Sequence, residues 1–144
     1  MIQQDTIKLL RECDAGIKMG VSSIEDVLDH VHSEDLRHHL TRCRDEHTAL
    51  QEEIQTMLAR CHDDGKDPNP IVTGMSWMKT NMKLGLHATD AIIADLMTDG
   101  CNMGVKSLSG YLNKYKAADE KSKDITKRLI KIEDRLATDM RAYL

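Results

Sequence analysis

Residues 6–31 read TIKLLRECDAGIKMGVSSIEDVLDHV, and from the LL pair onward an apolar side chain recurs every three or four residues. This spacing places the apolar side chains on one face of a helix, with polar and charged residues between them. A second stripe of this kind runs from Leu36 to Cys61, just after Ser33, a residue type that caps the first turn of helices. Because so few residues separate the two stripes, the two predicted helices must lie antiparallel, as a hairpin over about residues 4–64.

The second half of the chain repeats this organisation. Residues 13–18, CDAGIK, align with residues 101–106, CNMGVK, and the core positions of one half fall on core positions of the other. The second predicted hairpin covers about residues 88–143 and turns near Ala118. A duplicated hairpin joined by a long connection is one of the standard forms of four-helix bundle. The sequence therefore predicts an all-α four-helix bundle, made of two antiparallel helical hairpins, as a single domain over residues 1–144.

The connection between the hairpins is a long crossover of about residues 66–86, which contains both prolines of the chain. After the prolines a further amphipathic pattern predicts an extra short helix. Its apolar face carries Met75, Met78 and Met82, which with Trp77 form the densest apolar feature of the crossover, and methionine suits adaptable contacts. A four-helix bundle closes its core without this helix. Its apolar face is therefore either a lid over the bundle or the interface of a homodimer or of another protein partner.

The composition limits the classes of function. The net charge of −4 is spread in mixed signs and aromatic residues make up only 3%, which excludes the basic surface and stacking platform of nucleic-acid-binding proteins. No apolar run is long enough to span a bilayer, and the N-terminus lacks the pattern of a signal peptide, so we expect a cytoplasmic protein. The four cysteines are far apart, which favours free core thiols over disulfides.

This organisation resembles the ferritin-like superfamily, in which one long crossover joins two helical hairpins. Within it, the chain is similar to an uncharacterised bacterial branch, a domain-of-unknown-function family. The resemblance is carried by residues 9–16 (LLRECDAG), 74–79 (GMSWMK) and 96–101 (LMTDGC). Metal-binding members of the superfamily place a Glu on each of two helices and a Glu-x-x-His on each of the other two. The resemblance implies that a metal centre, if kept, lies in the middle of the bundle.

The sequence contains no Glu-x-x-His. In the alignment of the two halves, Arg44 to His47 falls on Glu133 to Leu136, so the first copy keeps the His and the second keeps the Glu. A helix rises about 1.5 Å per residue, which places His47 opposite Gly20, a residue that cannot be a ligand. We therefore expect no intact di-iron centre.

Four residues stay as candidate metal ligands, namely His47, Glu46, Asp14 and Glu133, with iron, manganese or zinc as the ion. On the same helix geometry, Asp14 and His47 are about 9 Å apart, too far to share one ion directly. His47 is either a core histidine, neutral and bonded to a backbone carbonyl or a nearby serine, or a single metal ligand. Asp14 and its counterpart Asn102 are expected to hydrogen-bond across the bundle centre and to fix its register.

Two hypotheses of function follow. The first is a non-enzymatic ferritin-like bundle without a cofactor, which acts by self-association as a dimer or by binding a protein partner. The alternative is a metal-binding ferritin-like oxidase or storage protein with a remodelled site. Hydrolase chemistry has no support, because the sequence has neither a Gly-rich phosphate loop nor a G-x-S-x-G motif.

Overall fold

The computed structural model describes residues 2–68 and 89–144. Within these ranges the chain forms four long α-helices and no strand, which confirms the predicted all-α class. The elements are α1 (Ile2–Leu28), α2 (Glu34–Arg60), α4 (Asp90–Lys114), α5 (Glu120–Met140) and the short 3-10 helix η1 (Arg141–Tyr143). The extra helix expected in the crossover, with Met75, Trp77, Met78 and Met82, lies outside the described residues.

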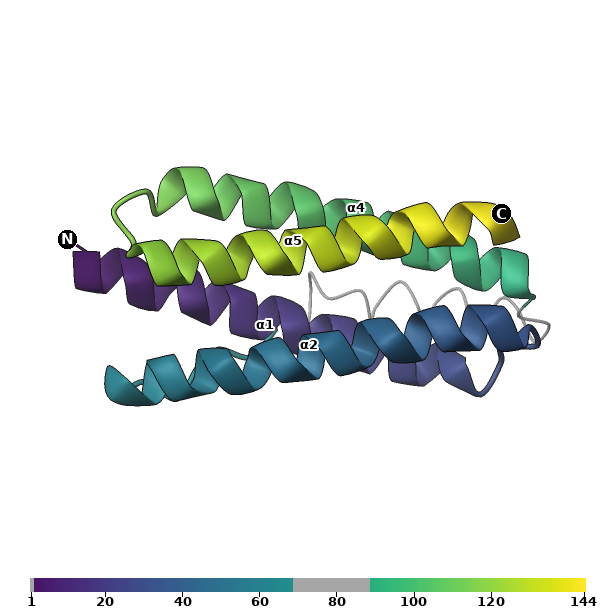
Figure 1. Ribbon diagram of the computed structural model, residues 1–144, viewed down its shortest axis with the longest axis horizontal. Helices are drawn as coiled ribbons and strands as arrows, with labels where there is room; N and C mark the ends of the chain where they lie inside the picture. The colour runs from purple at the N-terminus through teal and green to yellow at the C-terminus, as the bar shows by residue number, and fades with distance from the viewer. Residues whose placement is uncertain (1, 69–88) are drawn as a thin grey trace.

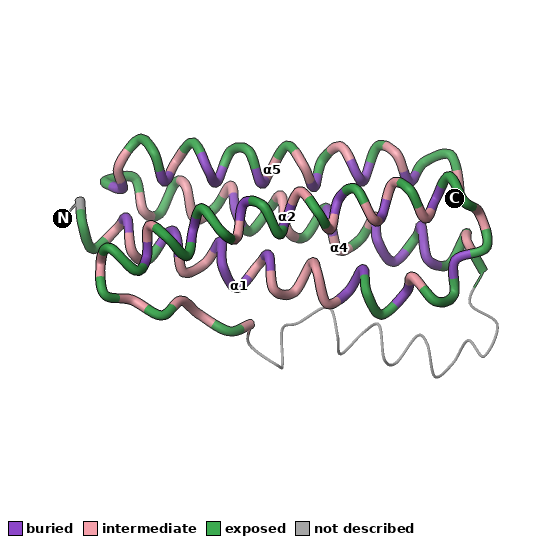
Figure 2. The backbone as a smooth tube through the Cα atoms, turned by 60° about the horizontal axis from the view of Figure 1, so that its bottom comes forward, coloured by how far each residue is buried: buried purple, intermediate pink, exposed green. Residues whose placement is uncertain are grey.

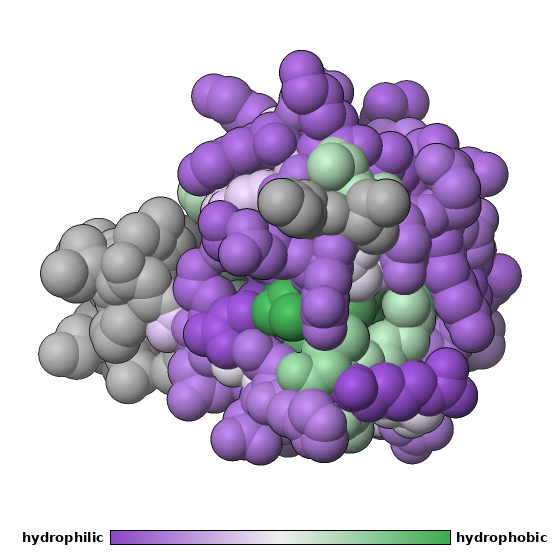
Figure 3. All heavy atoms as spheres, turned by 90° about the vertical axis from the view of Figure 1, so that its left-hand side faces the viewer, coloured by the Kyte–Doolittle hydropathy of each residue, from purple (hydrophilic) through white to green (hydrophobic). Residues whose placement is uncertain are grey.

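The four helices lie side by side along the long axis of the molecule (Figure 1). α1 packs against α2 and α4 packs against α5, while α2 and α5 also lie next to each other although they are far apart in the sequence. Each helix turns its buried residues inward and its exposed residues outward (Figure 2). Viewed from the end where α1 begins, apolar residues fill the middle and hydrophilic residues surround them (Figure 3). None of these helices is long and apolar enough to cross a membrane, within the described ranges.

Side-chain caps define where three of the helices begin. As predicted, the Ser33 hydroxyl oxygen accepts a hydrogen bond from the backbone N–H of Leu36, at 3.2 Å. Thr89 and Asp119 cap α4 and α5 in the same way. Such caps satisfy N–H groups that have no partner inside the helix, and each stabilises a helix by about 1 kcal/mol. The caps therefore fix the ends of the helices and, with them, the height of every residue along the bundle.

The core consists of two apolar clusters stacked along the bundle. The first contains Ile24, Val27, Val31, Leu36, Leu40, Cys43, Ile93, Ala94, Met97, Cys101, Leu136, Ala137 and Met140. The second contains Leu10, Cys13, Ile17, Leu50, Ile54, Leu58, Leu108, Ile125 and Leu129. All four cysteines are free thiols, as predicted, and all but Cys61 are buried.

Between the two clusters each helix contributes one residue that breaks its apolar stripe. We call this set the central layer, and it consists of Gly20 of α1, His47 of α2, Gly104 of α4 and Glu133 of α5. A side chain built on either glycine would meet its neighbour in the layer, His47 for Gly20 and Glu133 for Gly104. The contact between His47 and Glu133 completes the layer. The two charged side chains therefore occupy space that the two glycines leave open.

Candidate functional site

The site is built around His47 and Glu133, which are 2% and 8% exposed. Nε2 of His47 lies 3.5 Å from Oε1 of Glu133, an ion-pair distance that is longer than a good hydrogen bond. On the other side of the ring, Nδ1 donates to the carbonyl oxygen of Cys43 at 2.8 Å. The imidazole ring therefore links the backbone of α2 to a carboxylate of α5. Its bond to a backbone carbonyl agrees with the prediction of a core histidine.

The surroundings of His47 favour the charged form of its ring. Burial lowers the pKa of His47, but its contacts with Cys43 and with the carboxylate of Glu133 outweigh burial and raise the pKa to about 10. His47 is therefore an imidazolium at neutral pH, paired with a carboxylate. The partners expected for His47 all lie in the first half of the chain, whereas the carboxylate that keeps the proton on the ring comes from α5.

The two glycines of the central layer make room for this pair. A Cβ at position 20 would lie 3.2 Å from Nε2 of His47. A Cβ at position 104 would overlap with Oε2 of Glu133 and lie 2.7 Å from its Cδ. Position 20 therefore tolerates a methyl group only if the ring shifts slightly, and position 104 tolerates one only if the carboxylate leaves its place.

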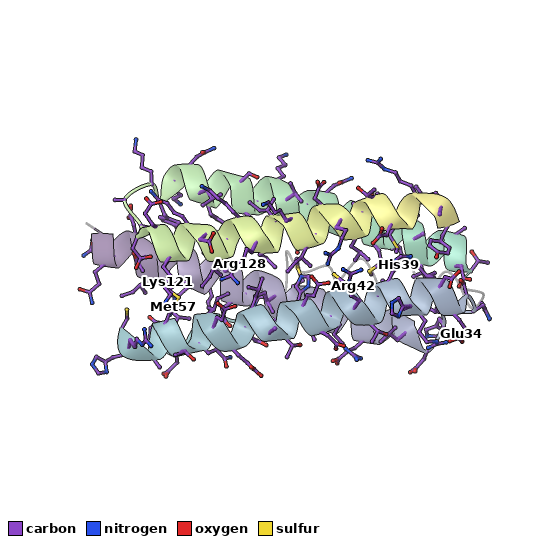
Figure 4. The ribbon with its side chains drawn as sticks, viewed as in Figure 1. Glu34, His39, Arg42, Met57, Lys121 and Arg128 are labelled. Atoms are coloured by element: carbon purple, nitrogen blue, oxygen red, sulfur yellow. The ribbon has the colours of Figure 1, made fainter. Side chains whose placement is uncertain are left out.

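Glu46, another expected ligand, is not part of the layer. It directly precedes His47 in α2, and neighbouring residues of a helix point about 100° apart, so the two side chains do not share a face. Oε1 of Glu46 lies 3.2 Å from Nε of Arg42 and also pairs with Arg135 of α5. Arg42 lies beside the seam between α2 and α5, as does Arg128 farther along (Figure 4). Glu46 therefore belongs to an outer row of ion pairs between these helices.

Asp14 is fully buried but has partners of its own. Its Oδ2 lies 2.8 Å from Nζ of Lys18 and accepts a hydrogen bond from the backbone N–H of Lys66 at 3.1 Å. Gly65, whose φ of +92° suits glycine, brings the chain close to this carboxylate, and a Cβ there would overlap with it. Asp14 therefore anchors the segment that follows α2. The expected hydrogen bond between Asp14 and Asn102 across the bundle centre is wrong, because Asn102 is exposed on α4.

Two empty spaces border the central layer. An inner cavity of about 50 Å³ is lined by His47, Glu133 and five sulfur-bearing side chains, namely Met19, Cys43, Met97, Cys101 and Met103. A larger space of about 260 Å³, which we call the outer groove, is lined by α1, by α4 and by Lys66 and Pro68 of the segment after α2. Glu133, Met19 and Met103 line both spaces. The carboxylate of Glu133 is therefore part of the wall between the buried ion pair and the groove.

The metal chemistry that this site can support is limited. Within the described ranges no group of three or more His, Cys, Asp or Glu side chains is placed to hold a metal ion. Of the four expected ligands, the structure brings together His47 and Glu133 and separates Glu46 and Asp14 from them. Burial, and then the charge of Glu133, raise the pKa of the Cys101 thiol, so this sulfur is a neutral thiol and not a ready thiolate ligand.

Comparisons with protein-family models, with curated proteins and with solved structures found no significant match to this chain. The resemblance to the ferritin-like superfamily therefore stays a prediction, carried by the sequence.

Sequence reasoning missed Gly104 as a member of the site and missed the pairing of Glu133 with His47. Gly104 stands in the repeated motif CNMGVK, but its role as the space for a carboxylate was not foreseen. Glu133 was foreseen as a metal ligand and not as the partner of His47. The signal was present in the alignment of the halves, where one copy keeps the His and the other keeps the Glu. Two incomplete and complementary motifs on neighbouring helices indicate a pair.

Proposed function

We propose that this chain is a ferritin-like bundle of two antiparallel hairpins with a His–Glu ion pair in place of a di-iron centre. We further propose that it acts by association, with itself or with a protein partner, and not as an enzyme. The observation that supports the first proposal is the composition of the central layer. A di-iron centre of the superfamily takes ligands from all four helices. Here α1 and α4 supply Gly20 and Gly104, which offer no side-chain ligand at this height.

The ion pair also removes the electrostatic need for a metal. A buried carboxylate is costly unless a cation compensates its charge, and metal ions play that part in the metal-binding members. In this chain the imidazolium of His47 compensates Glu133 at 3.5 Å. The central layer is therefore neutral as it stands, and added metal ions would have to displace a proton from the ring.

Within the described ranges, α4 carries two large apolar side chains that are exposed. Ile92 and Met103 are 41% and 40% exposed. They are about three helical turns apart and so lie on one face of α4. The surface expected to mediate association, formed by Met78 and its neighbours in the crossover, lies outside the described residues.

Light scattering tests the association directly. We expect a dimer that dissociates when Met78 and Met82 are both replaced by Glu, because two charges cannot be buried unpaired in an apolar interface. Leu144→Glu is the control, since Leu144 is 61% exposed and lies far from the crossover in the sequence. A monomer in all three proteins would contradict the proposal of self-association and leave the central layer unaffected.

The alternative function, a metal-binding oxidase or storage protein with a remodelled site, has one observation in its favour. Nε2 of His47 and Oε2 of Glu133 border the same cavity without a hydrogen-bond partner. Elemental analysis of protein produced with excess iron distinguishes the two functions. We expect no stoichiometric metal. About one iron, manganese or zinc per chain, lost in His47→Ala, would establish the alternative.

A further inference from the structure

The inner cavity beside the central layer has the features of a binding site for a very small apolar molecule. Its volume of about 50 Å³ has room for a few groups the size of a water molecule. Large apolar side chains of α1, α4 and α5 supply much of the described lining, among them Met19, Ile24, Met97, Met103 and Leu136. The cavity is therefore a space between apolar side chains in the middle of the bundle.

The polar atoms of the buried ion pair are not available to an occupant of this cavity. Nε2 of His47 and Oε2 of Glu133 have almost no accessible surface, although both residues line the cavity. Oε1 of Glu133 faces the ring, and Nδ1 of His47 is bonded to the carbonyl oxygen of Cys43. Ser23 supplies the hydroxyl group of the described lining. Because a buried water molecule needs two to four polar partners, the cavity suits a guest that forms no hydrogen bonds.

The charges beside the cavity favour an uncharged guest. The imidazolium of His47 and the carboxylate of Glu133 balance each other at 3.5 Å. An ion that entered the cavity would therefore meet no net opposite charge, and the burial of an unpaired ion is very costly. A neutral guest leaves the balance of the ion pair unchanged.

Sulfur atoms give the cavity its attraction for such a guest. Five of the described lining residues carry sulfur, namely Met19, Cys43, Met97, Cys101 and Met103. Sulfur is polarizable, and dispersion forces hold a neutral guest that fits closely. An apolar cavity of about 150 Å³ binds benzene or xenon, so the smaller volume here limits the guest to a few atoms. We propose that the inner cavity binds a small apolar gas molecule of the size of dioxygen.

Xenon and dioxygen, each dissolved under pressure, test this assignment by NMR of the full chain. We expect xenon to shift the methyl resonances of Met97 and Leu136, which line the cavity, and paramagnetic dioxygen to broaden them. Ile54 and Leu129 are the internal control, because both are fully buried in the second apolar cluster and neither is in the cavity lining. Equal effects on the two pairs of residues, or none on Met97 and Leu136, would overturn the proposal. A nuclear Overhauser effect between long-lived water and the Met97 methyl group would also overturn it, since water would then occupy the cavity.

Two substitutions at one position locate the binding. Cys101 is buried on α4 and lines the cavity. Cys101→Leu places a larger side chain in the space, whereas Cys101→Ala leaves the space open. We expect the xenon-induced shifts to be lost in Cys101→Leu and kept in Cys101→Ala. Ser23→Leu fills the same space from α1 and replaces Cys101→Leu if circular dichroism shows that the latter is unfolded. Xenon shifts that persist in a folded, filled variant would place the gas elsewhere and refute the assignment.

Discussion

Replacing Gly104 by alanine tests the packing of the central layer with a single methyl group. In an open helical position, Gly→Ala stabilises a protein by about 0.5–1 kcal/mol, because alanine has the higher helix propensity. At position 104 the added Cβ overlaps with Oε2 of Glu133 and lies 2.7 Å from its Cδ. The carboxylate must then move away from His47. Breaking one side of a buried ion pair costs about 3–5 kcal/mol, so we expect a net loss of about 2–4 kcal/mol.

The assay is reversible denaturant unfolding followed by far-ultraviolet circular dichroism, with Gly110→Ala as the control. Gly110 is exposed on the same helix, and a Cβ there meets nothing within 4 Å, so this variant should gain about 0.5–1 kcal/mol. In a Glu133→Ala background the clash is absent, and Gly104→Ala should become neutral or stabilising. If Gly104→Ala is as stable as Gly110→Ala in the natural background, the carboxylate is not where the structure places it.

Three further predictions concern the charged groups. The folded-state pKa of His47 is raised from 6.5 to about 10, so its stabilising effect is complete below pH 6.5 and is lost as the pH rises through about 10. The free energy of unfolding should fall over that window by up to about 1.4 kcal/mol per pH unit, and less in Glu133→Gln, as pH-dependent denaturant unfolding would show. At neutral pH, Glu133→Gln should lower the free energy of unfolding by about 3 kcal/mol, because Glu133 is buried. Glu46→Gln should lower it by under about 1 kcal/mol, because Glu46 pairs at the partly exposed surface. Equal losses in the same unfolding assay would contradict the difference in burial. Asp14→Ala should expose the backbone N–H of Lys66 to faster hydrogen exchange, measured by NMR, and unchanged protection would show that Asp14 does not anchor this segment.

The positions of the helices and the facing residues within one hairpin could be predicted from the sequence. The capping role of Ser33 is encoded locally, by a hydroxyl three residues before an amide that needs an acceptor. The register of α1 against α2 follows from a short turn and a constant rise per residue. The same arithmetic placed Gly20 opposite His47, and the structure confirms this contact.

Contacts between α2 and α5 could not be predicted in this way. How far α5 slides and rotates against α2 depends on the packing of side chains, and no short turn fixes it. The partner of His47 therefore stayed undetermined. For the same reason the expected hydrogen bond between Asp14 and Asn102 was wrong. The two residues occupy corresponding positions in the two halves of the chain, but these positions differ in burial. Asn102 points to solvent, whereas Asp14 lies under the segment that contains Gly65.

The central claim is that a protonated histidine, and not a metal, balances the buried carboxylate of Glu133. Nitrogen NMR of the His47 imidazole, in protein produced with excess iron, tests it most directly. We expect both ring nitrogens of His47 to carry a proton at neutral pH. We also expect their resonances to be sharp, as they are in the absence of a bound metal ion. A ring with one unprotonated nitrogen, or resonances broadened by a bound metal ion, would contradict it.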